Sequence, residues 1–589
     1  MKSLSFVLAF AWVAAGLGGF AACQAAHANP TVDTLRDVLV IGAWLAGIYG
    51  AVFGAFGLAA LAGTQVAQRV RPVSGGAEAA KLGFGVGHVA AFACAAVLVV
   101  GFFVTGKIDP GKLRSLLRIA TFGASLVAAV VATRVPLAHR LGGKIAGLFA
   151  VLVLVMLPVR VMGTQKKSEA SSAAAPASAS APSSTSTSAS ATPTAPTPAA
   201  TAAAGAKRRV FLIGIDGLEW RRIEPLRAKG LLPNFDALIK RGVHGPLHTF
   251  LPTWSPILWT TVATGVSANV HGVYDFTETP IPGLDCGIQR LRKTSLLPEH
   301  VGVTQVVDAA FDHGFLHELP VSACQRHVEA LWNILGEQKK RVAVVNWFAS
   351  WPAEPVNGYM VSDHNAQRAA FLSDKHHTAV GLEHGITYPE DLLEKQLAPI
   401  EVPEFADTAD AILALPFFAD LRPDERATLH AQLPLLQVFR HIYRSDEFAY
   451  AATQRILDKE AVDFLAVYAS GVDNTSHRFG LNTGVIDHYY QFVDKRLGEL
   501  LARADANTSI IVNSDHGWEY TDGPLYAHEH GPDGVIIVAG PHTPSDLALK
   551  KTPRLHDIAP TVLALFGYPK PARMEGEVIQ GALAGPLDS

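Results

Sequence analysis

Several acidic and histidine side chains lie at the ends of short apolar segments in the C-terminal part of the chain. Carboxylate oxygens and imidazole nitrogens are the usual protein ligands of divalent transition metals. Six such ligands in one crevice are too many for a single tetrahedral zinc ion, so they indicate a site for two metals. The six residues are Asp216, Asp473, His477, Asp515, His516 and His530.

The segments before these residues have the pattern of buried strands. RVFLIGI precedes Asp216, DFLAVYASGV precedes Asp473, and TSIIVNS precedes Asp515. Each is short, rich in β-branched residues and bounded by Gly, Asp or Asn, which predicts parallel strands. Because ligands bind at the carboxyl ends of such strands, we expect the side chains to converge there. His530 lies four residues before GVIIVAG, and its neighbours His528 and Glu529 are rivals for its place.

Taken singly, each of these residues has a simpler explanation, since a strand-terminal Asp is usually a turn or cap residue. Asp473 and His477 are four residues apart, which places them on one side of a helical turn. Asp515 and His516 are adjacent, so they could serve one metal only if the backbone bends, as it can at Gly517.

Ser255 is a candidate anion-binding residue. It directly precedes Pro256, a residue favoured in the first turn of a helix, so its oxygen would lie beside free backbone N–H groups. Such a helix start binds phosphate-like anions. A plain helix N-cap is the alternative role for Ser255.

The N-terminal part of the 589-residue chain is membrane-like. Residues 4–26, 38–68 and 82–106 are free of Asp, Glu, Lys and Arg, with His88 as the only basic side chain among them, and each is long enough to cross a bilayer core of about 30 Å. The shorter runs 119–133 and 145–159 are expected to be further spans, with a re-entrant hairpin as the alternative. We therefore predict a membrane region at 1–163 with four or five hydrophobic segments, the first of which could be a signal peptide.

Residues 164–207 are predicted to be a disordered linker, because 170–206 contain only small and polar residues apart from proline. Either interpretation of the first hydrophobic segment places the C-terminal part outside the cytoplasm.

The net charge of −3 gives no basic footprint for nucleic acid. Cys286 and Cys324 could pair in an oxidising compartment or remain buried thiols.

From residue 208 onward, strands alternate with helices, which predicts an α/β sandwich with one large insertion. Helical periodicity is present at 231–241, 325–337, 430–460 and 484–505. The segments 277–340 and 364–430 are expected to form a cap within an insertion at about 277–460.

Together the motifs resemble the type I phosphodiesterase and nucleotide pyrophosphatase branch of the alkaline phosphatase superfamily. The resemblance is carried by IGIDG, SPxxWTTxATGxxxxxHG, GVDNTSH, NSDHG and HGPDGVIIVAGP, and it covers nearly all of 208–589. It implies an alkaline-phosphatase-like three-layer α/β sandwich, here preceded by an α-helical membrane anchor. It also implies an enzyme that hydrolyses a phosphate-ester small molecule, nucleotide or lipid headgroup.

The resemblance further implies two zinc-like metal ions, although O and N ligands also suit manganese or calcium to differing degrees. Asp473, His477 and His530 would hold the first metal. Asp216, Asp515 and His516 would hold the second. Ser255 would bridge toward that metal as the nucleophile that forms a phosphoseryl intermediate, with Thr253 as its nearest competitor for this role.

The chain also departs from the family pattern. At the nucleophile it has Ser255-Pro256-Ile257-Leu258, where nucleotide pyrophosphatases of this branch have Thr-Phe-Pro-Asn. Because the phosphate-contacting Asn is missing, the preference between phosphodiesters and phosphomonoesters is left open. The alternatives are a phosphomonoesterase of the same superfamily, an envelope phosphoethanolamine or phosphoglycerol transferase, and a non-catalytic receptor. The sequence does not define the oligomeric state.

Overall fold

The structure is a computed structural model that describes residues 37, 39–41, 43–44, 207–289, 311, 314, 316–364, 384–397, 400, 406–480, 483–519, 528 and 530–584. Within these ranges no helix has both the length and the apolar character that a bilayer crossing needs. The predicted hydrophobic segments lie outside the described residues, apart from a few positions between 37 and 44. The predicted linker lies outside them as well, up to residue 206.

The chain divides into two compact units. One consists of Met1–Thr197 and Thr279–His317, and its described part includes strand β4 (Ile288–Gln289). The other consists of Pro198–Glu278 and Glu318–Ser589 and contains the large sheet and every candidate site residue. Cys286 and Cys324, whose state the sequence left open, are both disulfide-bonded.

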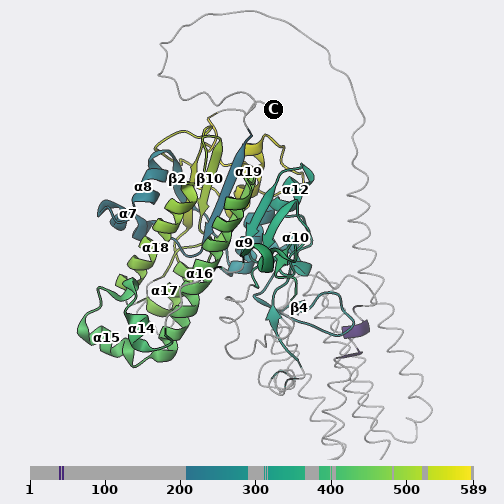
Figure 1. Cartoon of the computed structure of the whole chain (residues 1–589). Helices are drawn as coiled ribbons and strands as arrows, with labels where there is room; N and C mark the ends of the chain where they lie inside the picture. Colours follow the sequence, from purple (N-terminus) through teal and green to yellow (C-terminus); the bar gives the residue numbers. More distant parts are fainter. Residues whose placement is uncertain are drawn as a thin grey trace, which may run out of the picture. The chain divides into compact units, whose positions relative to one another are not determined.

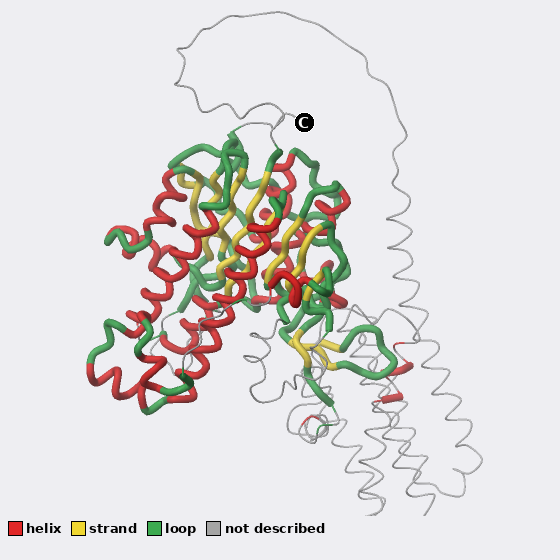
Figure 2. The backbone as a smooth tube through the Cα atoms, viewed as in Figure 1, coloured by secondary structure: helices red, strands yellow, loops and turns green. Residues whose placement is uncertain are grey.

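The second unit is built on a sheet in the order β12-β2-β11-β10-β1-β9-β6-β7-β8 (Figures 1 and 2). A separate antiparallel pair joins β3 (Thr277–Thr279) to β5 (Leu319–Pro320). The strands of the large sheet are β1 (Arg209–Ile215), β2 (Gly242–Leu247), β6 (Val342–Val345), β7 (Gly358–Val361), β8 (Thr387–Tyr388), β9 (Phe464–Ala469), β10 (Thr508–Asn513), β11 (Gly534–Ala539) and β12 (Leu547–Ala548).

The large sheet is mixed in direction. Strands β10, β1, β9, β6 and β7 run parallel, as the sequence predicted for β1, β9 and β10. Strand β11 is antiparallel to β10, and β8 is antiparallel to β7. Because β11 runs in the opposite direction, its first residue lies at the edge where β10 ends.

Helices cover both faces of the sheet, which gives three layers (Figure 1). Side chains of β1 alternate between the two apolar cores, as the period of two in a strand requires: Phe211 and Ile213 lie in one, Val210 and Leu212 in the other. The first core takes its helical residues from α7 (Trp220–Ala228), α8 (Pro233–Lys240), α14 (Ala409–Leu413), α15 (Pro423–His430), α16 (Leu433–Lys459), α17 (Gly471–Phe479) and α18 (Thr483–Leu501). The second takes them from α9 (Ser255–Thr264), α12 (Leu331–Glu337) and α19 (Ile558–Phe566).

Helix α9 carries the candidate nucleophile and is buried along its whole length. Pro256 lies in its first turn, where the missing N–H costs nothing. The helix stops at Gly265, which adopts a left-handed conformation with φ of 70° and is followed by the four-residue helix α10 (Ala268–His271). The Ser-Pro start and the Ala-Thr-Gly end of the motif thus fix both ends of the helix.

The predicted cap insertion at about 277–460 needs correction. Strands β6 and β7 come from its middle and are buried members of the large sheet. Helix α16, at its end, packs its apolar side chains into the same core as β1 and β9. The range resembled one insertion because its flanks are polar or rich in Pro and Gly. Its strands β6 (VAVV) and β7 (GYMV), however, are buried at every position, as central strands are. Residues 365–383 of the predicted cap lie outside the described residues.

Candidate metal centre

The carboxyl edge of the parallel strands brings the predicted side chains together. Asp216 follows β1, Asp473 lies in the first turn of α17 after β9, and Asp515 and His516 follow β10. Neighbouring parallel strands end at the same edge, so residues far apart in the sequence become neighbours.

One group of potential ligands consists of Asp216, Asp515 and His516, with one ligand atom from each within 4.8 Å of the others. His516 Nε2 lies 3.4 Å from Asp216 Oδ1 and 3.5 Å from Asp515 Oδ2. All three side chains are buried. The backbone N–H of His516 donates to Asp515 Oδ1, which fixes the carboxylate relative to the ring.

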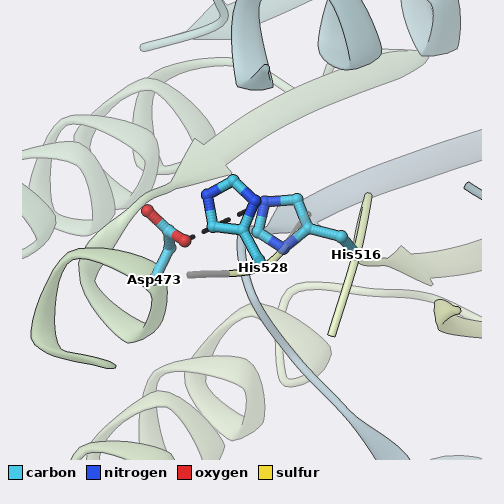
Figure 3. Close-up of side chains that lie close together, drawn as sticks. All are labelled: Asp473, His516 and His528. Carbon is cyan, nitrogen blue, oxygen red and sulfur yellow. Dashed lines mark ion pairs between the residues drawn. The ribbon is translucent and has the colours of Figure 1, made fainter. Parts of the chain in front are cut away.

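A second group consists of Asp473, His516 and His528 (Figure 3). His516 Nε2 lies 3.9 Å from Asp473 Oδ1, and the His516 and His528 rings stack with their centroids 3.9 Å apart. The exposed His477 lies beside this group, with Nε2 3.6 Å from Asp473 Oδ2. His516 therefore belongs to both groups.

Four ligand atoms of these groups are buried and lack hydrogen-bond partners among the described residues. Such atoms are rare in folded proteins, because each one carries an uncompensated desolvation cost. A cation would satisfy several of them at once, and O and N donors of this kind suit zinc or manganese. The residues therefore fit a metal centre. The atoms are Asp216 Oδ1, Asp473 Oδ1, Asp515 Oδ2 and His516 Nε2.

Burial also shifts the pKa values of the ligands. It raises the pKa of Asp473 and of Asp515 well above the usual range, and the charge of Asp216 adds to both shifts. Burial lowers the pKa of His516 and that of His528 to about 3, so both rings are neutral at physiological pH. A neutral imidazole is the form that binds a metal.

The second nitrogen of His516 and that of His528 already have partners. His516 Nδ1 lies 3.2 Å from the carbonyl oxygen of Gly517, and His528 Nδ1 lies 2.9 Å from Thr253 Oγ1. Contacts of this kind orient metal-binding histidines. Because a carbonyl oxygen can only accept, His516 Nδ1 carries the proton and Nε2 is left free to bind a metal. Thr253, which the sequence offered as a rival nucleophile, thus contacts a candidate ligand.

The structure places His528, and not the predicted His530, in the cluster. His530 is exposed on a turn and belongs to neither group. The two histidines are separated only by Glu529, which lies outside the described residues, and all three precede β11. Spacing alone could not choose between them, because the backbone path of this loop decides which ring faces the strand ends.

Replacing each histidine separately tests this placement. We expect His528→Ala to weaken zinc binding at least about 10-fold, because an imidazole donor of the cluster is lost. His530→Ala should leave the affinity near that of the wild type. The measurement is a zinc titration of the full-length chain against a competing chelator. The reverse result, with only His530→Ala weakened, would return the ligand role to His530.

Ser255 is the first residue of α9, on the same chain segment as Thr253. Its side chain is buried, with only 6% exposed. Helix α9 is tied directly to the cluster, because Trp259 Nε1 donates to Asp216 Oδ2 at 3.0 Å. Helix α9, which carries the candidate nucleophile, is therefore in contact with the candidate ligand Asp216.

Comparison with known proteins gives a family match. The family model described as type I phosphodiesterase / nucleotide pyrophosphatase matches residues 210–534, more than half of the chain. A 2,3-bisphosphoglycerate-independent phosphoglycerate mutase from Acaryochloris marina is 31% identical over 137 residues, which are 21% of this chain and 25% of the mutase. The chain thus spans about a quarter of the length of this relative.

Solved structures also match. Murine ectonucleotide pyrophosphatase / phosphodiesterase 5, determined in complex with AMP, is 13% identical with a TM-score of 0.33, and the match covers 64% of this chain and 100% of that one. A variant of the alkaline phosphatase PafA is 12% identical with a TM-score of 0.38, again over 64% of this chain and 100% of that one. Both TM-scores are below 0.5, so the family assignment rests on the sequence model.

Proposed function

Because the chain belongs to the type I phosphodiesterase / nucleotide pyrophosphatase family, we propose that it is a metal-dependent hydrolase of phosphate esters, with phosphodiesters as its preferred substrates. The observation that carries the proposal is the set of buried, unpaired carboxylate and imidazole atoms at the carboxyl edge of the sheet. A protein that used this edge only for structure would have no reason to bury four such atoms together.

Asp216, Asp515 and His516 would hold one metal ion, and Asp473 and His528 with His477 would hold a second. Bound there, the metals would supply positive charge that stabilises the transferring phosphoryl group and lowers the pKa of a coordinated hydroxyl. The ligand carboxylates would bind the ions, and the stacked rings of His516 and His528 would hold the ligand nitrogens in a fixed geometry.

Ser255 would be the nucleophile. Its Oγ would bond to phosphorus while the bond from phosphorus to the leaving-group oxygen breaks, and water would then cleave the phosphoserine. The start of α9 supports this role, since the free N–H groups of a first helical turn favour an anion. Burial of Ser255 also excludes bulk water from the attacking oxygen.

The preference between diesters and monoesters is tested by substrates that share one leaving group. The residues after Ser255 are the buried, apolar Pro256, Ile257 and Leu258, so this stretch provides no polar side chain for a second charged phosphate oxygen. We therefore expect the full-length chain to have a higher kcat/KM on bis(4-nitrophenyl) phosphate than on 4-nitrophenyl phosphate. The opposite order would assign the chain as a phosphomonoesterase, and no turnover of either in the presence of zinc or manganese would count against the hydrolase.

We further propose that the catalytic part is tethered to a membrane and lies outside the cytoplasm. The support is the series of uncharged segments before residue 160 and the small, polar linker that follows them. The disulfide-bonded state of Cys286 and Cys324 suits an oxidising compartment.

A reporter fusion tests this placement. A reporter that is active only after export, fused after Ala206, should be active, and a reporter that is fluorescent only in the cytoplasm should be dark at the same junction. The reason is that either interpretation of the first hydrophobic segment leaves residue 206 outside. A bright cytoplasmic reporter at this position would contradict the proposed topology.

A further inference from the structure

The carboxylate of Asp216 is held by two aromatic donors that the metal chemistry does not use. Trp259 Nε1 donates to Asp216 Oδ2 at 3.0 Å, and Tyr468 OH donates to the same oxygen at 2.6 Å. All three side chains are buried, with at most 1% exposed. The two rings also contact each other edge to face, with centroids 4.9 Å apart.

This arrangement divides the two oxygens of Asp216 between two tasks. Oδ2 accepts both hydrogen bonds, whereas Oδ1 has no hydrogen-bond partner in the described structure and lies 3.4 Å from His516 Nε2. Two donors on one oxygen fix the carboxylate plane, so that it presents the other oxygen toward the cluster. Outer contacts of this kind orient ligands and tune metal affinity.

Trp259 also connects the cluster to the nucleophile helix. It lies four residues after Ser255, one turn along the same face of α9. Its backbone carbonyl accepts a hydrogen bond from Trp347 Nε1 at 3.0 Å, so the residue is held from both sides. A Cβ at Gly214 would come within 2.4 Å of the Trp259 ring, which shows how closely the indole passes over β1.

We propose that Trp259 and Tyr468 are positioning residues, which hold Asp216 so that one oxygen faces the metal. Through Trp259 they also set the position of α9, and with it Ser255, relative to that metal. The inference rests on the proposed function, because it assumes that Asp216 is a metal ligand. Neither residue touches the reacting atoms; each acts through Asp216.

The test replaces each donor with a ring that cannot donate. Zinc binding to the full-length, chelator-stripped chain is titrated against a competing chelator for the wild type, Tyr468→Phe and Trp259→Phe. Each variant should lower the affinity of one of the two zinc equivalents by about 10- to 100-fold, while the other equivalent stays near the wild-type value. Melting temperatures confirm that each variant is folded.

Two matched controls lose the same chemical contact elsewhere. Trp332 donates its indole N–H to Glu354, and the hydroxyl of Tyr359 donates to Glu460; none of these residues belongs to the candidate groups. The change Trp332→Phe keeps a ring against Trp347. Trp332→Phe and Tyr359→Phe should therefore change stability by a similar amount and leave both zinc affinities unchanged. An equal loss of zinc affinity in these controls would overturn the inference, because it would show a general effect of destabilisation.

A double-mutant cycle separates positioning from packing. If Tyr468 acts through Asp216, Tyr468→Phe should change zinc affinity less than about two-fold when added to Asp216→Asn. If Tyr468→Phe and Trp259→Phe both bind zinc as tightly as the wild type, and Asp216→Asn loses one zinc ion, the positioning role is wrong. The proposed function would still stand. A wild-type chain that binds no zinc would remove both.

Discussion

Ser255→Ala should lower kcat on a phosphodiester by roughly three orders of magnitude or more, because removal of a covalent nucleophile takes away the attacking atom itself. Metal content should stay near the wild-type value, since the protein ligands at the strand ends remain. The variant should also fold normally, because a buried Ser→Ala change deletes one oxygen and leaves no large cavity. Single-turnover kinetics and metal analysis on the same preparation measure both quantities.

The control for this prediction must lie on the same helix without touching the cluster. Thr264→Val deletes a buried hydroxyl that donates to the carbonyl oxygen of Thr260, so it should cost about 1 kcal/mol of stability and leave kcat unchanged. Thr253→Ala is not a neutral control, because Thr253 contacts His528. If Thr253→Ala were inactive and Ser255→Ala normal, Thr253 would be the nucleophile; normal turnover in both would exclude a covalent intermediate on either hydroxyl.

The strand ends were predictable from the sequence because their signal is local. RVFLIGI, DFLAVYA and TSIIVN combine continuous apolar character with a polar residue at the stop, and each became a buried strand. Parallel strands place their carboxyl ends at one edge, so the meeting of Asp216, Asp473 and Asp515 followed from topology. Helix α9 was equally local, since Pro256 and Gly265 mark its ends.

Contacts between distant residues were not predictable. Tyr468 and Asp216 are 252 positions apart, and Tyr468 reads in the sequence as one more apolar residue of a buried strand. His528 and Thr253 are 275 positions apart, and the choice between His528 and His530 depends on the path of one loop. The position of β6 and β7 in the sheet was obscured because polar flanks separate them from the other strands. Such partners are set by packing across the sheet, which a single sequence does not encode locally.

Removing the metals should abolish turnover, and adding zinc or manganese should restore it. The wild-type chain should bind two ions, and Asp515→Ala and His477→Ala should each lose about one. The reason is that the two residues serve different ligand groups: Asp515 belongs to the group with Asp216, and His477 lies beside Asp473. Metal analysis after gel filtration gives the stoichiometry, and turnover of each variant is measured at saturating metal.

His477 is the decisive residue of this pair, because His516 is shared by both groups. Nε2 of His516 has one lone pair and can bind only one ion. If the ion held by Asp216 and Asp515 takes this nitrogen, the other ion keeps only Asp473 and His528 and needs another donor. His477 is 3.6 Å from Asp473 and can supply that donor. His488→Ala, which removes a histidine that contacts Asp420 on another surface, should keep two ions. A wild-type chain with one ion, unchanged in His477→Ala, would mean a single metal centred on His516 and would contradict the two-metal site.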